Sequence, residues 1–279
     1  MNTKINLAGV ELKNPVMTAS GTFGSGMEYS EFVDLNKLGA VVTKGVANVP
    51  WPGNPTPRIA ETYGGMINAI GLQNPGIDVF CERDIPFLKK YDTKIIVNVC
   101  GKSERDYVEV VERLAGEPVD MLEINISCPN VKEGGIAFGQ NAANIEHITK
   151  AIKNVAKQPV IMKLSPNVTD ITEMAKAAEA GGADVLSLIN TITGMKIDIN
   201  RQTFAVANKT GGLSGPAVKP VAVRMVYQVA NAVKIPIIGM GGIATAEDAL
   251  EFILAGATAV SIGTANFHNP RTTLEVIEG

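Results

Sequence analysis

A thiol lies three residues after an asparagine in the segment Asn125-Ile-Ser-Cys-Pro-Asn130. The segment follows an apolar run over residues 119–124, which is typical of a buried strand. Asn125 would therefore close a strand, and Cys128 would lie in a loop that contains Pro129. Loops of this kind carry reactive groups in proteins built from parallel strands. Cys128 could thus be a nucleophile, or a small buried side chain that only fills the core.

Two lysines also end apolar runs. Lys44 follows Ala40-Val-Val-Thr, and Lys163 follows Val160-Ile-Met. We expect both ammonium groups to point into one opening, where a buried cation needs an anion such as a phosphate, a carboxylate or the anionic edge of a flavin. The alternative is an ion pair with Glu123, which shares strand parity with Asn125.

Glycines follow two later strands in the same way. Gly241-Gly242 and Gly263-Thr264 come after the seventh and eighth apolar runs, where many barrels bind a phosphate through backbone N–H groups. The segment Gly211-Gly-Leu-Ser-Gly215 could add further exposed N–H donors. The early segment 21–26 has the wrong glycine spacing for a dinucleotide-binding turn, so we do not expect a Rossmann domain.

The elements that must position these residues alternate between strand and helix along the whole chain. Strands are expected at residues 15–21, 40–45, 94–100, 120–126, 159–164, 184–190, 235–240 and 259–263. Helices are expected at residues 29–38, 75–90, 104–115, 144–156, 171–180, 217–233, 246–255 and 272–278, the last of them apparently cut short. Eight such units in about 250 residues predict an α/β protein with a closed (β/α)₈ TIM barrel.

Residues 5–12 predict a short N-terminal β-hairpin that turns at Ala8-Gly9 and closes the bottom of the barrel. The sequence shows no linker, so residues 1–279 are expected to form a single barrel domain. A doubly wound protein of two domains is the alternative. In a barrel the carboxyl ends of the strands carry the function. Read from those ends, the polar or glycine positions are Ser20, Lys44, Asn98, Asn125, Lys163, Asn190 with Thr191, Gly241-Gly242 and Gly263-Thr264.

Composition narrows the function further. The chain has 279 residues, a formal net charge of −3 and no cluster of Lys and Arg, which argues against binding to nucleic acid or to an anionic membrane. No apolar run approaches the roughly 20 residues that span a bilayer. The three cysteines are widely spaced, which predicts a reducing cytoplasm, and the two histidines do not form a metal motif.

Four segments together resemble one known family. Asn68-Ala-Ile-Gly-Leu-Gln-Asn-Pro-Gly76, Asn125-Ile-Ser-Cys-Pro-Asn130, Met162-Lys-Leu-Ser-Pro166 and Gly239-Met-Gly-Gly-Ile243 are similar to segments of the soluble class 1 dihydroorotate dehydrogenases. The similarity runs from about residue 5 to the end of the chain. That family oxidises dihydroorotate to orotate in pyrimidine biosynthesis, with FMN over the mouth of the barrel.

The resemblance implies residues for each ligand. FMN would contact Ser20, Lys44, Gly45, Asn98, Asn125, Lys163, Ile189, Gly215, Gly241, Gly242, Gly263 and Thr264. The substrate would contact Lys44, Asn68, Ala69, Ile70, Gly71, Leu72, Asn125, Asn190 and Thr191. The phosphate of FMN would lie against Gly215 and the two glycine pairs, in agreement with the glycine pattern.

The resemblance also implies a mechanism. FMN N5 would take a hydride from C6 of dihydroorotate, and Cys128 would take the proton from C5 as a base. A cysteine at this position is typical of the soluble class, because membrane-associated relatives have serine. The asparagine amides suit the alternating N–H and C=O groups of a pyrimidine. Lys163 would stabilise negative charge on the flavin. Residues 131–139 are expected to form either a lid over the thiol or an ordinary long loop.

Residues 53–62 and 68–75 look more like the NAD⁺-linked subtype (1B) of the family than the fumarate-linked homodimer. In that subtype a catalytic homodimer joins two electron-transfer subunits, which carry FAD and a [2Fe–2S] cluster, to form a heterotetramer. The chain contains no cysteine cluster and no dinucleotide motif, so both groups would come from the partner. Three further functions stay open: a related FMN dihydropyrimidine dehydrogenase, a flavin-dependent tRNA dihydrouridine synthase and an inactive flavin-binding barrel.

Overall fold

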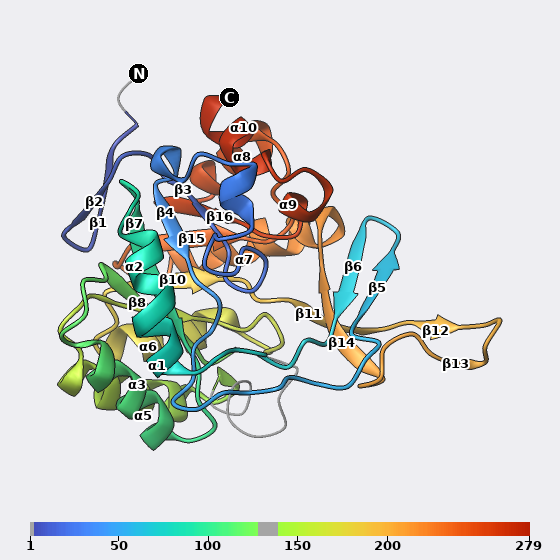
Figure 1. The fold of residues 1–279 in the computed structure, drawn as a ribbon, viewed down its shortest axis with the longest axis horizontal. Helices are drawn as coiled ribbons and strands as arrows, with labels where there is room; N and C mark the ends of the chain where they lie inside the picture. The colour runs from blue at the N-terminus through green and yellow to red at the C-terminus, as the bar shows by residue number, and fades with distance from the viewer. Residues whose placement is uncertain (1–2, 128–138) are drawn as a thin grey trace.

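The computed structural model describes residues 3–127 and 139–279, and at its centre eight parallel strands form a closed barrel (Figure 1). In chain order the barrel strands are β3 (Val16–Thr18), β4 (Ala40–Val42), β7 (Lys94–Val99), β8 (Met121–Asn125), β9 (Val160–Lys163), β10 (Val185–Leu188), β15 (Ile237–Met240) and β16 (Ala259–Ile262). The last strand pairs with the first, Val260 opposite Val16, which closes the barrel. Each strand lies within its predicted range, so the (β/α)₈ prediction is confirmed.

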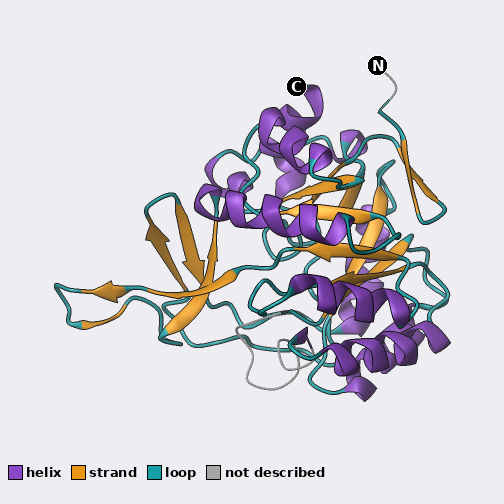
Figure 2. Ribbon diagram, turned by 180° about the vertical axis from the view of Figure 1, so that it is seen from behind, coloured by secondary structure: helices purple, strands orange, loops and turns teal. Residues whose placement is uncertain are grey.

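Helices cover the outside of the barrel between successive strands (Figure 2). They are η1 (Tyr29–Glu31), η2 (Leu35–Lys37), α1 (Ile77–Val79), η3 (Phe80–Asp84), α2 (Ile85–Leu88), α3 (Glu104–Leu114), α5 (Ala142–Val155), α6 (Ile171–Ala180), η4 (Pro216–Val218), α7 (Lys219–Ala230), α8 (Ala246–Leu254), α9 (Ala265–His268) and α10 (Thr272–Glu278). Within residues 3–127 and 139–279, none of these helices combines the length and the apolar character needed to cross a membrane.

Two predicted helices differ from the structure. The helix expected at 29–38 is wrong: two separate 3₁₀ turns are present, because Asp34 adopts an extended backbone and its carboxylate accepts from the Asn36 N–H. The helix expected at 75–90 begins after Gly76, whose positive φ is not helical, and contains a π-helical segment before Pro86. Proline has no N–H to donate to the preceding turn, which accounts for the irregular segment.

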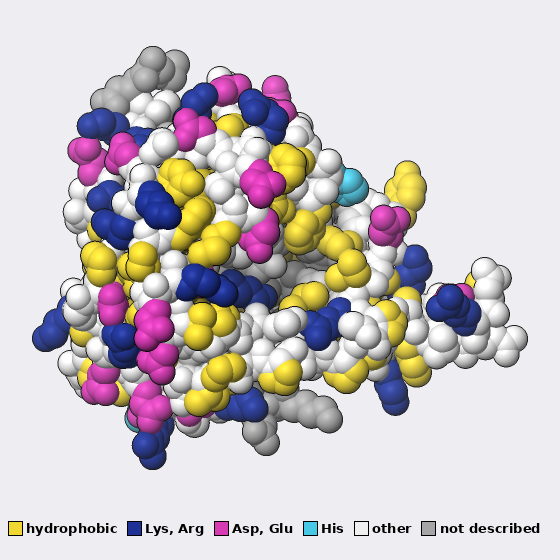
Figure 3. Space-filling view, in the orientation of Figure 1, with side chains coloured by type: hydrophobic (Ala, Val, Ile, Leu, Met, Phe, Trp, Pro, Cys, Tyr) yellow, Lys and Arg dark blue, Asp and Glu magenta, His cyan; other side chains and the backbone are white. Residues whose placement is uncertain are grey.

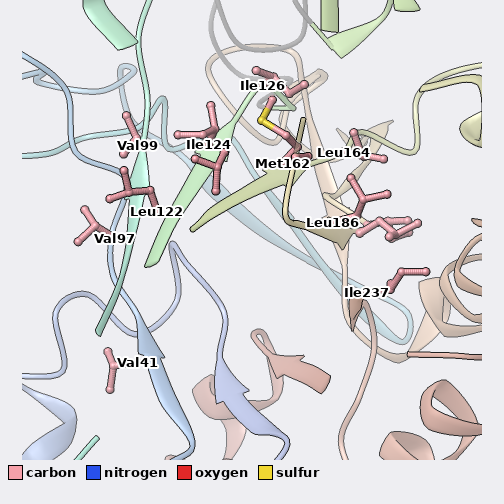
Figure 4. Close-up of a cluster of buried hydrophobic side chains, with 14 of the residues drawn as sticks. Val41, Val97, Val99, Leu122, Ile124, Ile126, Met162, Leu164, Leu186 and Ile237 are labelled. Carbon is pink, nitrogen blue, oxygen red and sulfur yellow. The ribbon is translucent and has the colours of Figure 1, made fainter. Parts of the chain in front are cut away.

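Apolar side chains fill two regions, one outside and one inside the barrel. Outward-facing residues of the strands pack against the helices, and Figure 4 shows Val97, Leu122 and Met162 in this outer cluster. A second cluster fills the lower interior of the barrel. It includes fully buried Leu7 and Leu12 from the hairpin β1 (Ile5–Leu7) and β2 (Val10–Leu12). The predicted closure of the barrel by the N-terminal hairpin is therefore confirmed.

A four-stranded antiparallel sheet beside the barrel mouth was not predicted. It has the order β11-β14-β6-β5, and a two-stranded ladder extends from it at the far right of Figure 1. The strands are β5 (Ile59–Thr62), β6 (Gly65–Asn68), β11 (Ile192–Met195), β12 (Ile197–Asp198), β13 (Thr203–Phe204) and β14 (Thr210–Ser214). They come from two distant insertions, one after β4 and one after β10, which meet where Asn68 pairs with Gly212.

Candidate active site

A cavity opens at the carboxyl ends of the barrel strands, between the barrel and the β5–β6–β14 sheet. In the space-filling view this region is hollowed, and Lys or Arg side chains reach its edge (Figure 3). Every barrel strand contributes to the wall from its last residues or from the loop that follows. The residues predicted for a cofactor that line the cavity are Ser20, Lys44, Gly45, Asn98, Asn125, Lys163, Ile189, Gly215, Gly241, Gly242, Gly263 and Thr264.

Most residues predicted for the substrate line the same cavity. They are Asn68, Ile70, Gly71, Leu72, Asn190 and Thr191, together with Lys44 and Asn125. Ala69 does not: it is buried against Ile67 and Val206, and its N–H donates to the carbonyl of Arg58 at 2.7 Å. Alternate residues of an extended strand point to opposite faces, so Asn68 and Ala69 cannot both face the cavity. The predicted base Cys128 and the predicted lid, apart from Gly139, lie outside the described residues.

A chain of amide and hydroxyl groups joins three asparagines that line the cavity to Ser127. Asn125 Nδ2 donates to Asn98 Oδ1 at 3.3 Å, and Asn125 Oδ1 accepts from the N–H of Ser127 at 3.3 Å and from its Oγ at 3.1 Å. Asn190 Nδ2 donates to Ser127 Oγ at 2.8 Å and to its carbonyl at 3.1 Å. Three asparagines from three different strand ends are thus joined through the residue that precedes Cys128.

Gly45 makes room for this arrangement. A Cβ at Gly45 would lie 2.8 Å from Asn98 Oδ1, closer than real Cβ contacts allow. The position therefore requires glycine for the Asn98 amide to occupy its place in the wall. The sequence had singled out Gly45 only through the family resemblance, and the contact supplies its physical reason.

Both predicted lysines reach the cavity wall. Lys44 Nζ lies 3.9 Å from the position of a Cβ at Gly21, and Lys163 is buried at the end of β9. Glu123 was the alternative partner for either lysine. Its two carboxylate oxygens accept from Asn98 Nδ2 at 2.6 Å and from Ser187 Oγ at 2.8 Å. The cavity therefore combines neutral amides, two cationic side chains and a carboxylate beneath them.

The glycines on the opposite wall bring backbone segments into close contact. A Cβ at Gly215 would lie 2.6 Å from Gly65 Cα, and a Cβ at Gly241 would lie 2.8 Å from Ala222 Cβ. Nearby, Ser261 carries a buried hydroxyl that has no hydrogen-bond partner within the described structure. Glycine backbone and a hydroxyl without a partner beside a cavity are suited to the oxygens of a phosphate or a carbonyl.

The prediction for Gly211–Gly215 was wrong in part. Residues 210–214 form strand β14, which pairs with β11 on one side and β6 on the other, so these residues are not an open loop of donors. Gly215 alone leaves the strand, with a φ of +102°, and precedes η4. Next to it, Thr264 Oγ1 donates to Ser214 Oγ at 2.8 Å, which ties the loop after β16 to the end of β14.

Sequence reasoning missed several residues of the wall. Met240 and Ser261 could have been found, because they share the inward parity of their barrel strands. Ile59 and Met66 belong to the unpredicted sheet, and Phe267 follows the last barrel strand; no periodic pattern marks them. The remaining missed residues are Ala19, Gly21, Thr22 and Ser214.

The other two cysteines are unsuited to act as bases. Cys100 is fully buried, and burial raises the pKa of the Cys81 thiol to about 11. A thiol with that pKa is almost entirely protonated at neutral pH. The described ranges 3–127 and 139–279 also contain no group of three or more His, Cys, Asp or Glu side chains arranged to hold a metal ion.

Comparison with known proteins agrees with this geometry. A family model described as dihydroorotate dehydrogenase matches residues 2–279. A protein of Lachnoclostridium phytofermentans named dihydroorotate dehydrogenase B (NAD(+)), catalytic subunit, is 78% identical over all of this chain and 93% of its own length. A protein of Alkaliphilus metalliredigens with the same name is 69% identical over all of this chain and 92% of its own length. The crystal structure of DHODH from Eimeria tenella in complex with ferulenol has a TM-score of 0.83 and 25% identity, covering 99% of this chain and 83% of that one.

Proposed function

The chain belongs to the dihydroorotate dehydrogenase family, and on that premise we propose that it oxidises dihydroorotate to orotate with FMN bound at the mouth of its barrel. It does so as the catalytic subunit of an NAD⁺-linked enzyme in pyrimidine biosynthesis. The observation that carries this proposal is the convergence of eight strand ends on one cavity that holds amides, lysines and a glycine wall together.

The residues present fit FMN. Gly215, Gly241 and Gly242 line the cavity where the phosphate would bind, and the unpartnered Ser261 hydroxyl offers a further polar contact. Lys163 places a positive charge in the same cavity, which suits the electron-rich edge of the flavin ring. When bound, FMN supplies the acceptor for the hydride of the substrate. These residues support FMN as the cofactor of this chain.

The substrate is held by amide groups. Asn68, Asn125 and Asn190 line the cavity, and each amide offers both a donor and an acceptor to the N–H and C=O groups of a pyrimidine ring. Lys44 provides a cation for the carboxylate of dihydroorotate. Cys128 removes the proton from C5. It follows Ser127 directly in the sequence, and Ser127 is hydrogen-bonded to both Asn125 and Asn190. Loss of that proton and of the C6 hydride leaves the double bond of orotate.

The electrons leave through a partner. The relatives are named as catalytic subunits of an NAD⁺-linked enzyme, which supports a second subunit for this chain as well. We assign that subunit FAD and a [2Fe–2S] cluster, and we assign the assembly two copies of each chain. A cytoplasmic location accompanies these assignments, because three widely spaced cysteines suit a reducing compartment.

The final electron acceptor can be identified with the purified chain loaded with FMN. This chain is expected to oxidise dihydroorotate and to pass electrons to NAD⁺ only when its electron-transfer subunit is added. Efficient fumarate reduction by the lone chain would reject the NAD⁺-linked assignment. Faster turnover of dihydrouracil than of dihydroorotate would reject the substrate and favour the related dihydropyrimidine dehydrogenase.

A Cys128→Ala variant tests the base. We expect it to bind FMN normally and to lose at least about a hundredfold in turnover, the usual contribution of a positioned base. A free thiol has a pKa near 8.5, so wild-type turnover should rise between roughly pH 7 and pH 9. Cys81→Ala is the matched control, because that thiol is buried outside the cavity. Full turnover by Cys128→Ala would exclude Cys128 as the base.

A further inference from the structure

Glu123 is a buried carboxylate in the interior of the barrel, and its surroundings give it a specific role. It is 1% exposed on β8, between the apolar lower interior and the polar mouth. Burying a carboxylate is unfavourable unless hydrogen bonds compensate for the lost water. Both oxygens are satisfied by neutral donors from neighbouring parts of the barrel, Asn98 Nδ2 on β7 at 2.6 Å and Ser187 Oγ on β10 at 2.8 Å. Both donors are fully buried as well.

The carboxylate gives a direction to the chain of hydrogen bonds above it. Because an ionised carboxylate can only accept, Asn98 must turn its NH₂ group toward Glu123 and its Oδ1 away from it. Asn98 Oδ1 then accepts from Asn125 Nδ2, so Asn125 turns its own Oδ1 toward Ser127. Each amide has nearly the same shape in either orientation, so packing alone would not choose between the two. Glu123, the hydrogen-bond acceptor at the buried end of this network, determines which orientation each amide adopts.

We infer that Glu123 is a positioning residue, which fixes the orientation of the Asn98 and Asn125 amides and thereby the atoms that these amides present at the cavity. This inference rests on the proposed function, in which both amides contact the ligands. Reversal of Asn98 would place an NH₂ group against the NH₂ group of Asn125. Asn125 would then have to reverse as well, and Ser127, which precedes Cys128, would lose the Asn125 oxygen as its acceptor.

Gly45 makes room for the Asn98 amide without choosing its orientation. Asn98 Oδ1 lies 2.8 Å from the position that a Cβ at residue 45 would occupy, so a side chain there would displace the amide. The network is also closed from the far side, because Asn190 Nδ2 donates to Ser127 Oγ. Buried networks of this kind are effective when every member is satisfied. Glu123 is the member that accepts without donating at the deepest point of the chain.

The test compares two variants of identical shape. Ser187→Ala removes one donor but keeps the carboxylate facing Asn98, so the direction of the chain is retained. Adding Glu123→Gln to Ser187→Ala introduces an NH₂ group, and of the two hydrogen-bond partners of residue 123 only Asn98 remains. That NH₂ group is satisfied only if the Asn98 amide reverses. Asp84→Asn is the matched control for loss of a buried carboxylate, because Asp84 is 2% exposed and does not line the cavity.

Two readouts are expected to separate the variants. In FMN-loaded protein, the dissociation constant of orotate, followed by the flavin absorption spectrum, should rise on the order of tenfold from Ser187→Ala to Glu123→Gln/Ser187→Ala. Ligand-free, ¹⁵N-labelled protein should show the side-chain amide signals of Asn98 and Asn125 moving between the same two variants. Equal orotate affinities and unmoved amide signals in the two variants would overturn the inference.

The side-chain amide signals distinguish a failure of this inference from a failure of the proposed function. If wild-type protein fails to bind orotate or to oxidise dihydroorotate, the proposed function fails, while the amide signals still decide whether Glu123 sets the direction. If the double variant does not fold, Glu123→Gln combined with Asn98→Asp replaces it. This exchange swaps carboxylate and amide and keeps an acceptor facing Asn125. Its Asn125 signals are expected to match those of wild type, and a reversed Asn125 amide in that protein would overturn the inference.

Discussion

The carbonyl oxygen of Gly215 lies 2.8 Å from the position that a Cβ atom on Gly242 would occupy. Gly242 also has a φ of +82°, a conformation that L side chains rarely adopt. Two loops that are distant in sequence therefore meet through backbone alone at the wall proposed to bind the phosphate of FMN.

Gly242→Ala should separate these loops and weaken FMN binding. We expect the dissociation constant of FMN to rise at least about tenfold, with a loss of roughly 1–2 kcal/mol in the free energy of unfolding from the strained backbone. Titration of apoprotein into FMN, followed by flavin fluorescence, measures the first quantity. Gly116→Ala is the control, because a Cβ there meets no atom within 4 Å. Unchanged FMN affinity in Gly242→Ala would remove this wall from the phosphate site.

Gly212→Ala should weaken the binding of the substrate rather than of FMN. Thr191 Oγ1 lies 1.9 Å from the position of a Cβ at Gly212, so any side chain there must displace Thr191. Because Thr191 is proposed to contact dihydroorotate, we expect the KM for dihydroorotate to rise on the order of tenfold while FMN affinity stays within about twofold. Steady-state kinetics on FMN-loaded protein provide the measurement.

Gly194→Ala is the matched control in the same sheet. Its nearest neighbour would be Leu213 Cβ at 3.7 Å, an ordinary contact, so its KM should remain at the wild-type value. Similar KM values for the two variants would show that Thr191 does not position the substrate.

Asp248 predicts a pH dependence of stability at the start of α8. Burial raises the pKa of Asp248, but hydrogen bonds from Lys219 and from the N–H groups of Ala244 and Thr245 outweigh that effect and lower the pKa overall. A carboxyl group with a lowered pKa in the folded state stabilises the protein above its ordinary pKa. That contribution is lost as the pH falls through the lowered value.

Asp248→Asn should therefore be less stable than wild type by about 1 kcal/mol at pH 7, the usual contribution of such a cap, and the difference should shrink below about pH 4. Urea unfolding of both proteins from pH 7 to pH 3 measures the difference. Glu112→Gln, at an exposed carboxylate of α3, should show no comparable gap. A gap that stayed constant with pH would mean that the charge of Asp248 is not involved.

The barrel could be predicted because its strands are buried on both faces. Runs such as Val160-Ile-Met and Ala40-Val-Val are continuously apolar, and the lysine that follows each run, directly or after Thr43, marks the mouth. Because each lysine ends such a run, Lys44 and Lys163 were predicted to face the mouth of the barrel, and both line the cavity. Ala69 was assigned with its neighbours as a block, without regard to strand alternation.

The side sheet could not be predicted because its strands are short, half-exposed and rich in glycine. Strand β14 reads Thr-Gly-Gly-Leu-Ser, which is typical of a loop, and it becomes a strand only by pairing with β11 and β6. The hydrogen-bond partners of Glu123 could not be predicted for a similar reason. Strand parity placed its side chain inside, but only closure of the barrel brings Asn98 and Ser187 to it.

Tyr107 links the helix layer to the end of the strand that carries the site. Its Oη donates to the carbonyl oxygen of Asn125 at 2.8 Å, and the ring is fully buried on α3. Tyr107→Phe removes this donor from a buried carbonyl and should lower the free energy of unfolding by about 1–3 kcal/mol. The carbonyl of Asn125 lies two residues before Ser127 and three before Cys128 in the sequence. Turnover should therefore fall several-fold, while FMN affinity stays near wild type.

Urea unfolding of apoprotein and turnover of FMN-loaded protein measure the two effects of Tyr107→Phe separately. Tyr63→Phe is the control, since that side chain is fully exposed and its hydroxyl faces water. Loss of stability without loss of turnover would confine Tyr107 to a structural role. Loss of both, with FMN still bound, means that the hydrogen bond from α3 holds the end of β8 in the position that the base requires.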